Sequence, residues 1–75
     1  MANEIKLLRF LAQDMTQAEL GKRVGLTRQT IAAIEQERYS PTLDVAFRIA
    51  HVFGKPIDEV FHWTPPEGGG DPGKG

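Results

Sequence analysis

Apolar residues recur at intervals of three and four along residues 1–63, and no stretch alternates with the period of two that marks a half-buried strand. This pattern predicts an all-α fold of five helices. The expected helices span residues 3–13, 17–24, 28–36 and 43–53, followed by a short one after Pro56. The residues expected to point inward are Ile5, Leu8, Leu11 and Ala12 in the first helix, Leu43, Ala46, Phe47, Ile49, Ala50 and Phe53 in the fourth, and Ile57, Val60 and Phe61 in the fifth.

The second and third helices have clear boundary signals. Thr16 is a good N-cap, and Glu19 three residues later completes a capping box. Gly25 is suited to the left-handed conformation that ends many helices, and Thr27 is the next N-cap. The turn between these two helices is therefore expected to contain only three residues.

Small and aliphatic residues in this segment predict a steep crossing of the two helices. Gly21 would allow close contact between them. The aliphatic residues expected to hold the pair against the rest of the domain are Leu20, Val24, Ile31 and Ile34. This packing would leave the third helix protruding, and a protruding helix fits the major groove of B-DNA. Arg28 and Gln29 would then face base edges, where arginine suits guanine and glutamine suits adenine.

The charge distribution permits a weakly basic surface. The 75 residues have a net charge of −1, but residues 1–55 hold eight basic and six acidic residues, whereas residues 56–75 hold one and four. Residues 64–75 are dominated by proline and glycine, and we expect them to form a flexible tail after a single domain at 1–63. At that size, association with a second copy is a natural source of extra stability.

Several function classes lack the residues that they need. The chain has no cysteine, which excludes disulfides and thiolate zinc sites. His51 and His62 stand on different helices without an acidic pair nearby, so no metal or cofactor is expected. No nucleophile, base and orienting group can be assembled, so we expect no enzyme. An apolar run of membrane-spanning length and a signal peptide are both missing from the sequence, which favours a cytoplasmic protein.

Three segments carry a resemblance to a known family. They read TQAEL at 16–20, VGLTRQTI at 24–31 and SPTL at 40–43. Over roughly residues 4–63 the sequence resembles the XRE family of helix-turn-helix regulators, the group of lambda repressor and Cro. The resemblance implies a five-helix lambda-repressor-like fold that binds double-stranded operator DNA, usually as a homodimer.

The resemblance also implies roles for individual residues. Arg28, Gln29 and Thr30 would form the base-reading edge, while Gln17, Thr27 and Arg38 would contact phosphates. The chain departs from the family pattern near Asp14, where a glycine is common and the spacing from the arginine of the first helix is one residue shorter. It departs again at residues 36–37, where Gln-Glu replaces a frequent Asn-Gly and puts an acid beside the expected phosphate contact.

Structural roles compete with these assignments. Arg28 and Gln29 could belong to a solvated first turn, and Lys22 and Arg23 are equally compatible with solvated charges and with phosphate contacts. Arg9 and Glu35 could form an ion pair between the first and third helices, which would remove Arg9 from DNA. The apolar residues that could form either core or a dimer interface are Val45, Val52 and Trp63.

These observations predict a sequence-specific transcriptional regulator, a repressor that binds a two-fold operator as a homodimer. The alternative, from a different class, is an antitoxin that binds a toxin protein and regulates its own promoter. In that case a protein partner would join DNA as a ligand.

Overall fold

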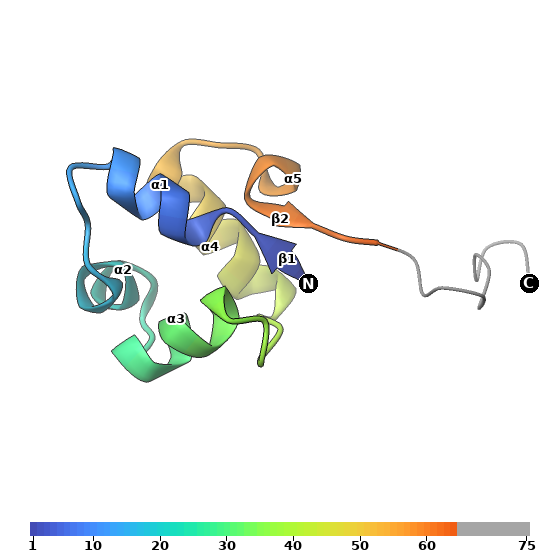
Figure 1. Cartoon of the computed structure of the whole chain (residues 1–75), viewed down its shortest axis with the longest axis horizontal. Coiled ribbons are helices and arrows are strands. Elements are labelled where there is room, and N and C mark those ends of the chain that lie inside the picture. Colours follow the sequence, from blue (N-terminus) through green and yellow to red (C-terminus); the bar gives the residue numbers. More distant parts are fainter. Residues whose placement is uncertain (65–75) are drawn as a thin grey trace, which may run out of the picture.

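The computed structural model of the protein describes residues 1–64, so the predicted tail lies outside the described residues apart from Thr64. The described part forms five helices and one small sheet (Figure 1). In chain order these elements are β1 (Ala2–Asn3), α1 (Ile5–Leu11), α2 (Gln17–Val24), α3 (Arg28–Glu35), α4 (Leu43–Phe53), α5 (Ile57–Val60) and β2 (Phe61–His62). The predicted all-α, five-helix class is confirmed, with the two short strands as an addition.

Helix α4 is the centre of the domain. In Figure 1, α1 lies above it and α2 and α3 lie below it. The buried core residues are Ile5, Leu20, Val24, Ile31, Ile34, Ala46, Ile49, Ala50, Val60 and Phe61. They come from every helix and from β2, so one core holds all the elements together, and the four aliphatic residues predicted to anchor α2 and α3 are among them. Among the described helices, none has the length and apolar character needed to cross a membrane.

The two ends of the described chain meet in the small sheet. β1 pairs antiparallel with β2, with Ala2 opposite His62 and Asn3 opposite Phe61. The predicted start of the first helix at residue 3 is therefore wrong. Asn3 instead joins the strand to the core elements: its side-chain amide donates a hydrogen bond to the Ile34 carbonyl (2.9 Å). Strands of two residues are too short to produce an alternating pattern in the sequence.

Three predicted core residues are exposed. Leu11, Leu43 and Phe47 expose 67%, 69% and 53% of their surfaces. At 3.6 residues per turn, Leu11 lies about 240° around α1 from buried Ile5 and points away from the core. On α4, the buried side is centred on Ala46, Ile49 and Ala50, and Leu43 and Phe47 lie beyond its edge. Together with Leu7 and Phe10 on α1, which are also exposed, these residues form two apolar faces on the surface of the domain.

The caps of α2 and α3 are those that the sequence predicts. The Thr16 hydroxyl accepts a hydrogen bond from the Glu19 N–H (3.0 Å), and the Thr27 hydroxyl accepts one from the Thr30 N–H (3.2 Å). Between these helices Gly25 ends α2 with φ +79°, a left-handed conformation that side chains resist. The predicted turn of three residues is confirmed.

Gly21 is the point of closest approach in this helix pair. Its carbonyl accepts a hydrogen bond from the Leu26 N–H (2.8 Å). A Cβ atom at residue 21 would lie 2.5 Å from the Leu26 carbonyl oxygen and 3.3 Å from the Thr27 carbonyl carbon. Because both neighbours are backbone atoms, the turn itself would have to move to admit any side chain.

We expect Gly21→Ala to lower the free energy of unfolding by about 2 kcal/mol or more, since the added methyl overlaps the backbone of the turn. Urea unfolding followed by circular dichroism measures this change. Gly25→Ala is the matched control: its new methyl would meet only the end of the Arg48 side chain at 3.7 Å, so it should cost only the strain of the left-handed conformation, about 1–2 kcal/mol. A Gly21→Ala protein as stable as the wild type would contradict the close contact.

Candidate nucleic-acid interface

Arg28 and Gln29 stand at the exposed start of α3. Both side chains are exposed, and within residues 1–64 neither makes a hydrogen bond or an ion pair. Helix α3 lies at the lower edge of the domain in Figure 1, where no other helix covers its outer side. The guanidinium group and the amide are therefore both available to an external partner. Their predicted role in base reading stays a prediction.

The two threonines at the start of α3 lie together. Their hydroxyl oxygens are 3.0 Å apart, and the Thr27 hydroxyl also caps the helix. A hydroxyl group has one donor and two acceptor positions, so each can make a further contact without giving up this pairing. Thr30, predicted to read bases, and Thr27, predicted to contact phosphate, thus form one rigid first turn.

A polar network beneath α3 holds two residues that the sequence analysis discussed separately. Glu35 accepts hydrogen bonds from the Arg9 guanidinium at 2.6 and 3.0 Å. The Gln17 amide donates to the same carboxylate at 3.1 Å, and Arg9 also donates to the Met15 carbonyl at 2.8 Å. The side chains of Arg9 and Glu35 are 15% and 7% exposed. The predicted Arg9–Glu35 ion pair is confirmed, and it removes Arg9 from the surface that α3 presents.

The network also fixes Gln17 at the first residue of α2. The Gln17 side chain was expected to contact phosphate, and the sequence gave no sign of its bond to a carboxylate 18 residues away. The phosphate role of Gln17 stays a prediction. In this position, its backbone N–H belongs to the first turn of a helix, where amides have no partner within the helix.

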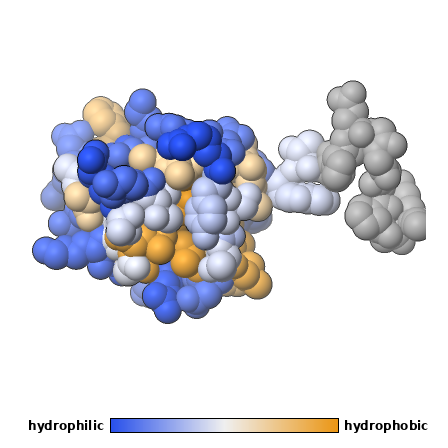
Figure 2. Space-filling view, turned by 90° about the horizontal axis from the view of Figure 1, so that it is seen from below, coloured by the Kyte–Doolittle hydropathy of each residue, from blue (hydrophilic) through white to orange (hydrophobic). Residues whose placement is uncertain are grey.

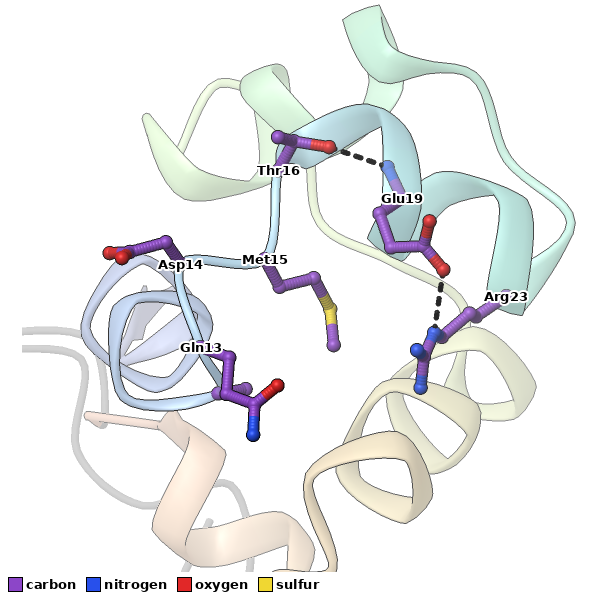
Figure 3. A pocket seen from close by; sticks show the side chains of 7 residues that line it. Gln13, Asp14, Met15, Thr16, Glu19 and Arg23 are labelled. Carbon is purple, nitrogen blue, oxygen red and sulfur yellow. Dashed lines mark hydrogen bonds and ion pairs between the residues drawn. The ribbon is translucent and has the colours of Figure 1, made fainter.

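The basic residues of α2 differ in their surroundings. Arg23 donates a hydrogen bond to Glu19 at 2.9 Å, one turn away on the same helix (Figure 3). This hydrogen bond and the positive charge of Arg23 lower the pKa of the Glu19 carboxyl from its usual value of 4.5. Arg23 is thus engaged within its own helix, whereas Lys22 is exposed.

The loop after α3 carries the last predicted phosphate contact. Arg38 is exposed and donates a hydrogen bond to the Gln36 side chain at 2.9 Å. Glu37 has a φ of +62°, a conformation that glycine adopts more easily, and its carboxylate lies 4.0 Å from the N-terminal amine. The acid that replaces the frequent family glycine is therefore turned toward a positive charge of the protein itself.

Two further features of this face were not predicted. Gln36 ends α3 seven residues after Gln29, so the two amides share a side of the helix; that spacing was the signal that could have identified Gln36. The second feature is a surface hollow of about 410 Å³, lined by Leu26, Gln29, Thr30, Ala33 and Tyr39. Figure 2 shows the molecule from the α3 side, where hydrophobic surface is exposed between hydrophilic residues.

The remaining candidates from the sequence fall elsewhere. Val45 and Val52 are half-buried and pack against the core, whereas Trp63 follows β2 and is 65% exposed. His62 lies 2.8 Å from the Glu4 carboxylate, an ion pair between the two ends of the domain when the imidazole is protonated. In residues 1–64, no three histidine, aspartate or glutamate side chains come together as a metal site would require.

Comparisons with known proteins agree with this geometry. A family model described as helix-turn-helix matches residues 5–60. An uncharacterized HTH-type transcriptional regulator of Methanocaldococcus jannaschii is 43% identical over 67 residues, which cover 89% of this chain and 100% of the relative. One from Bacillus subtilis is 42% identical over 67 residues, covering 89% and 98%. Another, from Methanothermobacter thermautotrophicus, is 54% identical over 48 residues, covering 63% and 70%.

We expect Arg9→Gln to lower the free energy of unfolding by about 2–3 kcal/mol, because it leaves the buried Glu35 carboxylate without its charged partner. Arg23→Gln is the matched control. It breaks the exposed pair with Glu19 and should cost less than about 0.5 kcal/mol. Equal losses of stability for the two variants, measured by urea unfolding, would show that the network beneath α3 is not a buried constraint.

Proposed function

The chain belongs to the helix-turn-helix family of transcriptional regulators, and from this premise we propose that it binds operator DNA by sequence and represses transcription as a homodimer. The observation that carries the proposal is the pair of long polar side chains, Arg28 and Gln29, exposed and unpaired within the described residues at the protruding start of α3. Residues in this position face base edges when a helix enters the major groove.

Base reading would use the first turn of α3. The Arg28 guanidinium has the fork geometry that matches the O6 and N7 acceptors of guanine, and the Gln29 amide can both donate to and accept from adenine. The Thr30 hydroxyl is held by Thr27, so it would offer a fixed contact to a neighbouring base. Two adjacent alanines, at residues 32 and 33, keep the outer side of α3 thin enough to approach the floor of the groove.

Phosphate contacts would supply most of the affinity. Gln17 with the first amides of α2, the Thr27 hydroxyl and the Arg38 guanidinium are the groups we assign to this role, and neutralised phosphates release counterions. The Arg9–Glu35 pair keeps Gln17 in a fixed position before DNA arrives. A pre-formed contact of this kind saves ordering entropy on binding.

A homodimer would place two α3 helices in successive major grooves about 34 Å apart. The exposed apolar residues available for an interface are Leu43 and Phe47 on α4 and Trp63 after β2. Val45 and Val52, proposed from the sequence, are already packed against the core and contribute less. The proposal places the protein in the cytoplasm, where it reaches DNA, and requires no cofactor.

Selection of bound sequences from a random duplex pool tests the proposal. We expect one recurrent site made of two inverted halves, with centres 10–11 base pairs apart or a multiple of that spacing. Sedimentation of the protein with this duplex should show two chains per site. A pool that yields no recurrent sequence would sink sequence-specific binding, and a single unpaired half-site with one chain would sink the homodimer.

We expect Arg28→Ala to weaken binding to the selected duplex by about 10- to 100-fold, because it removes a bidentate contact to a base. The melting temperature should stay within about 1 °C of wild type, since the side chain is exposed. Lys55→Ala, an exposed cation in the loop between α4 and α5, is the matched control for loss of one positive charge. Equal weakening on selected and random duplexes would mean that Arg28 contacts only phosphate.

An antitoxin is the second candidate function, and the exposed face of α1 favours it. Leu7, Phe10 and Leu11 expose 52%, 67% and 67% of their surfaces, on the helix that Figure 1 places across the domain from α3. A protein partner could cover this face while α3 stays free for DNA. Purification of the native protein with a stoichiometric small partner, lost in Phe10→Lys, would support this function; a protein recovered only with itself would argue against it.

A further inference from the structure

The hollow beside the base-reading residues is built from three parts of the chain. Leu26 comes from the turn before α3; Gln29, Thr30 and Ala33 come from α3 itself; and Tyr39 comes from the loop that follows. The hollow therefore exists only because the loop after α3 folds back beside the helix. Its volume of about 410 Å³ is ample for a methyl group and the edge of the base that bears it.

Most of the hollow's lining is apolar. Leu26 also packs against the core, so its position is fixed from below. Ala33 is half-buried, and Tyr39 leaves 49% of its surface exposed. Gln29 and Thr30 supply polar groups at the same place, and Arg28 and Arg38 are the cations next to the lining residues in the chain. An apolar hollow beside polar and positively charged residues matches a ligand with one apolar group on a polyanionic backbone.

We propose that this hollow binds the C5-methyl group of a thymine in the operator. The inference rests on the proposed function, because it needs α3 to lie in the major groove. Among the four bases, thymine alone presents an apolar group on that side of the duplex, whereas the other edges present donors and acceptors. A donor or acceptor placed against Leu26, Ala33 and the Tyr39 ring would lose its hydrogen bonds to water without replacement.

The position of Gln29 makes the contact compatible with base reading. Gln29 lines the hollow and also faces base edges, so a thymine methyl in the hollow would lie next to the base that its amide contacts. Ala33 is one turn further along the same side of α3. Its small side chain leaves the hollow open, whereas a longer one at this position would fill it. Specificity would thus combine polar reading by Arg28 and Gln29 with methyl reading by the hollow.

Replacing thymine by deoxyuridine tests this assignment, because the substitution removes the methyl group and keeps every donor and acceptor. Each thymine of the selected duplex is replaced singly, and dissociation constants are measured by fluorescence anisotropy. We expect one position in each half-site to lose about four-fold in affinity, the value of one buried methyl group. At a cytosine placed in that position, 5-methylation should restore part of the loss.

Protein variants assign the methyl effect to the hollow. Ala33→Gln fills the hollow and Tyr39→Ala removes one wall, so both should abolish the difference between thymine and deoxyuridine. Ala12→Gln, the same change made on the cap of α1, should keep it. Circular dichroism melting confirms that each variant is folded before binding is compared.

The outcomes separate the two proposals. A selected site at which no thymine methyl matters overturns the methyl assignment and leaves sequence-specific binding intact. A methyl effect that persists unchanged in both Ala33→Gln and Tyr39→Ala belongs to another surface and also overturns it. A random pool that yields no recurrent site overturns both proposals together.

Discussion

The backbone contact between Gly21 and the turn that follows α2 is the constraint on which the surface of this protein depends. With only a hydrogen at residue 21, the Leu26 carbonyl lies where a Cβ atom would have to be. Because Leu26 directly precedes the cap of α3, this contact sets where the helix begins and at what angle it leaves the turn. The buried aliphatic residues of α2 and α3 then fix that angle against α4.

The polar groups of the site fall into two sets with different environments. Arg9, Glu35 and Gln17 pair with one another beneath α3, where both charges are largely shielded from water. Arg28 and Gln29 stay in solvent. The first set makes the helix position rigid, and the second can exchange water for another partner at small cost. A recognition surface needs both, because a mobile helix would pay ordering entropy on every encounter.

The proposed interface also combines two kinds of chemistry on one helix. Its leading turn is polar, whereas the neighbouring hollow is lined largely by apolar groups from Leu26, Ala33 and Tyr39. Major-groove edges present both kinds of group, so a helix that offers only hydrogen bonds would ignore part of the information there. The same residues also explain why a weakly charged domain is a reasonable DNA-binding protein: selectivity among sites comes from shape and local chemistry, whereas charge raises affinity for all of them.

The sequence determined the features that depend on neighbours within one or two turns. Thr16, Gly25 and Thr27 define the helix ends, and the spacing of aliphatic residues defines the helices, because capping and periodicity are local. Only the tertiary structure decided which apolar residues stay exposed, how the strands pair and where the Gln17 amide points. The same holds for the hollow completed by Tyr39. These features join segments far apart in the chain, such as Asn3 with Ile34, and local patterns contain no record of such contacts.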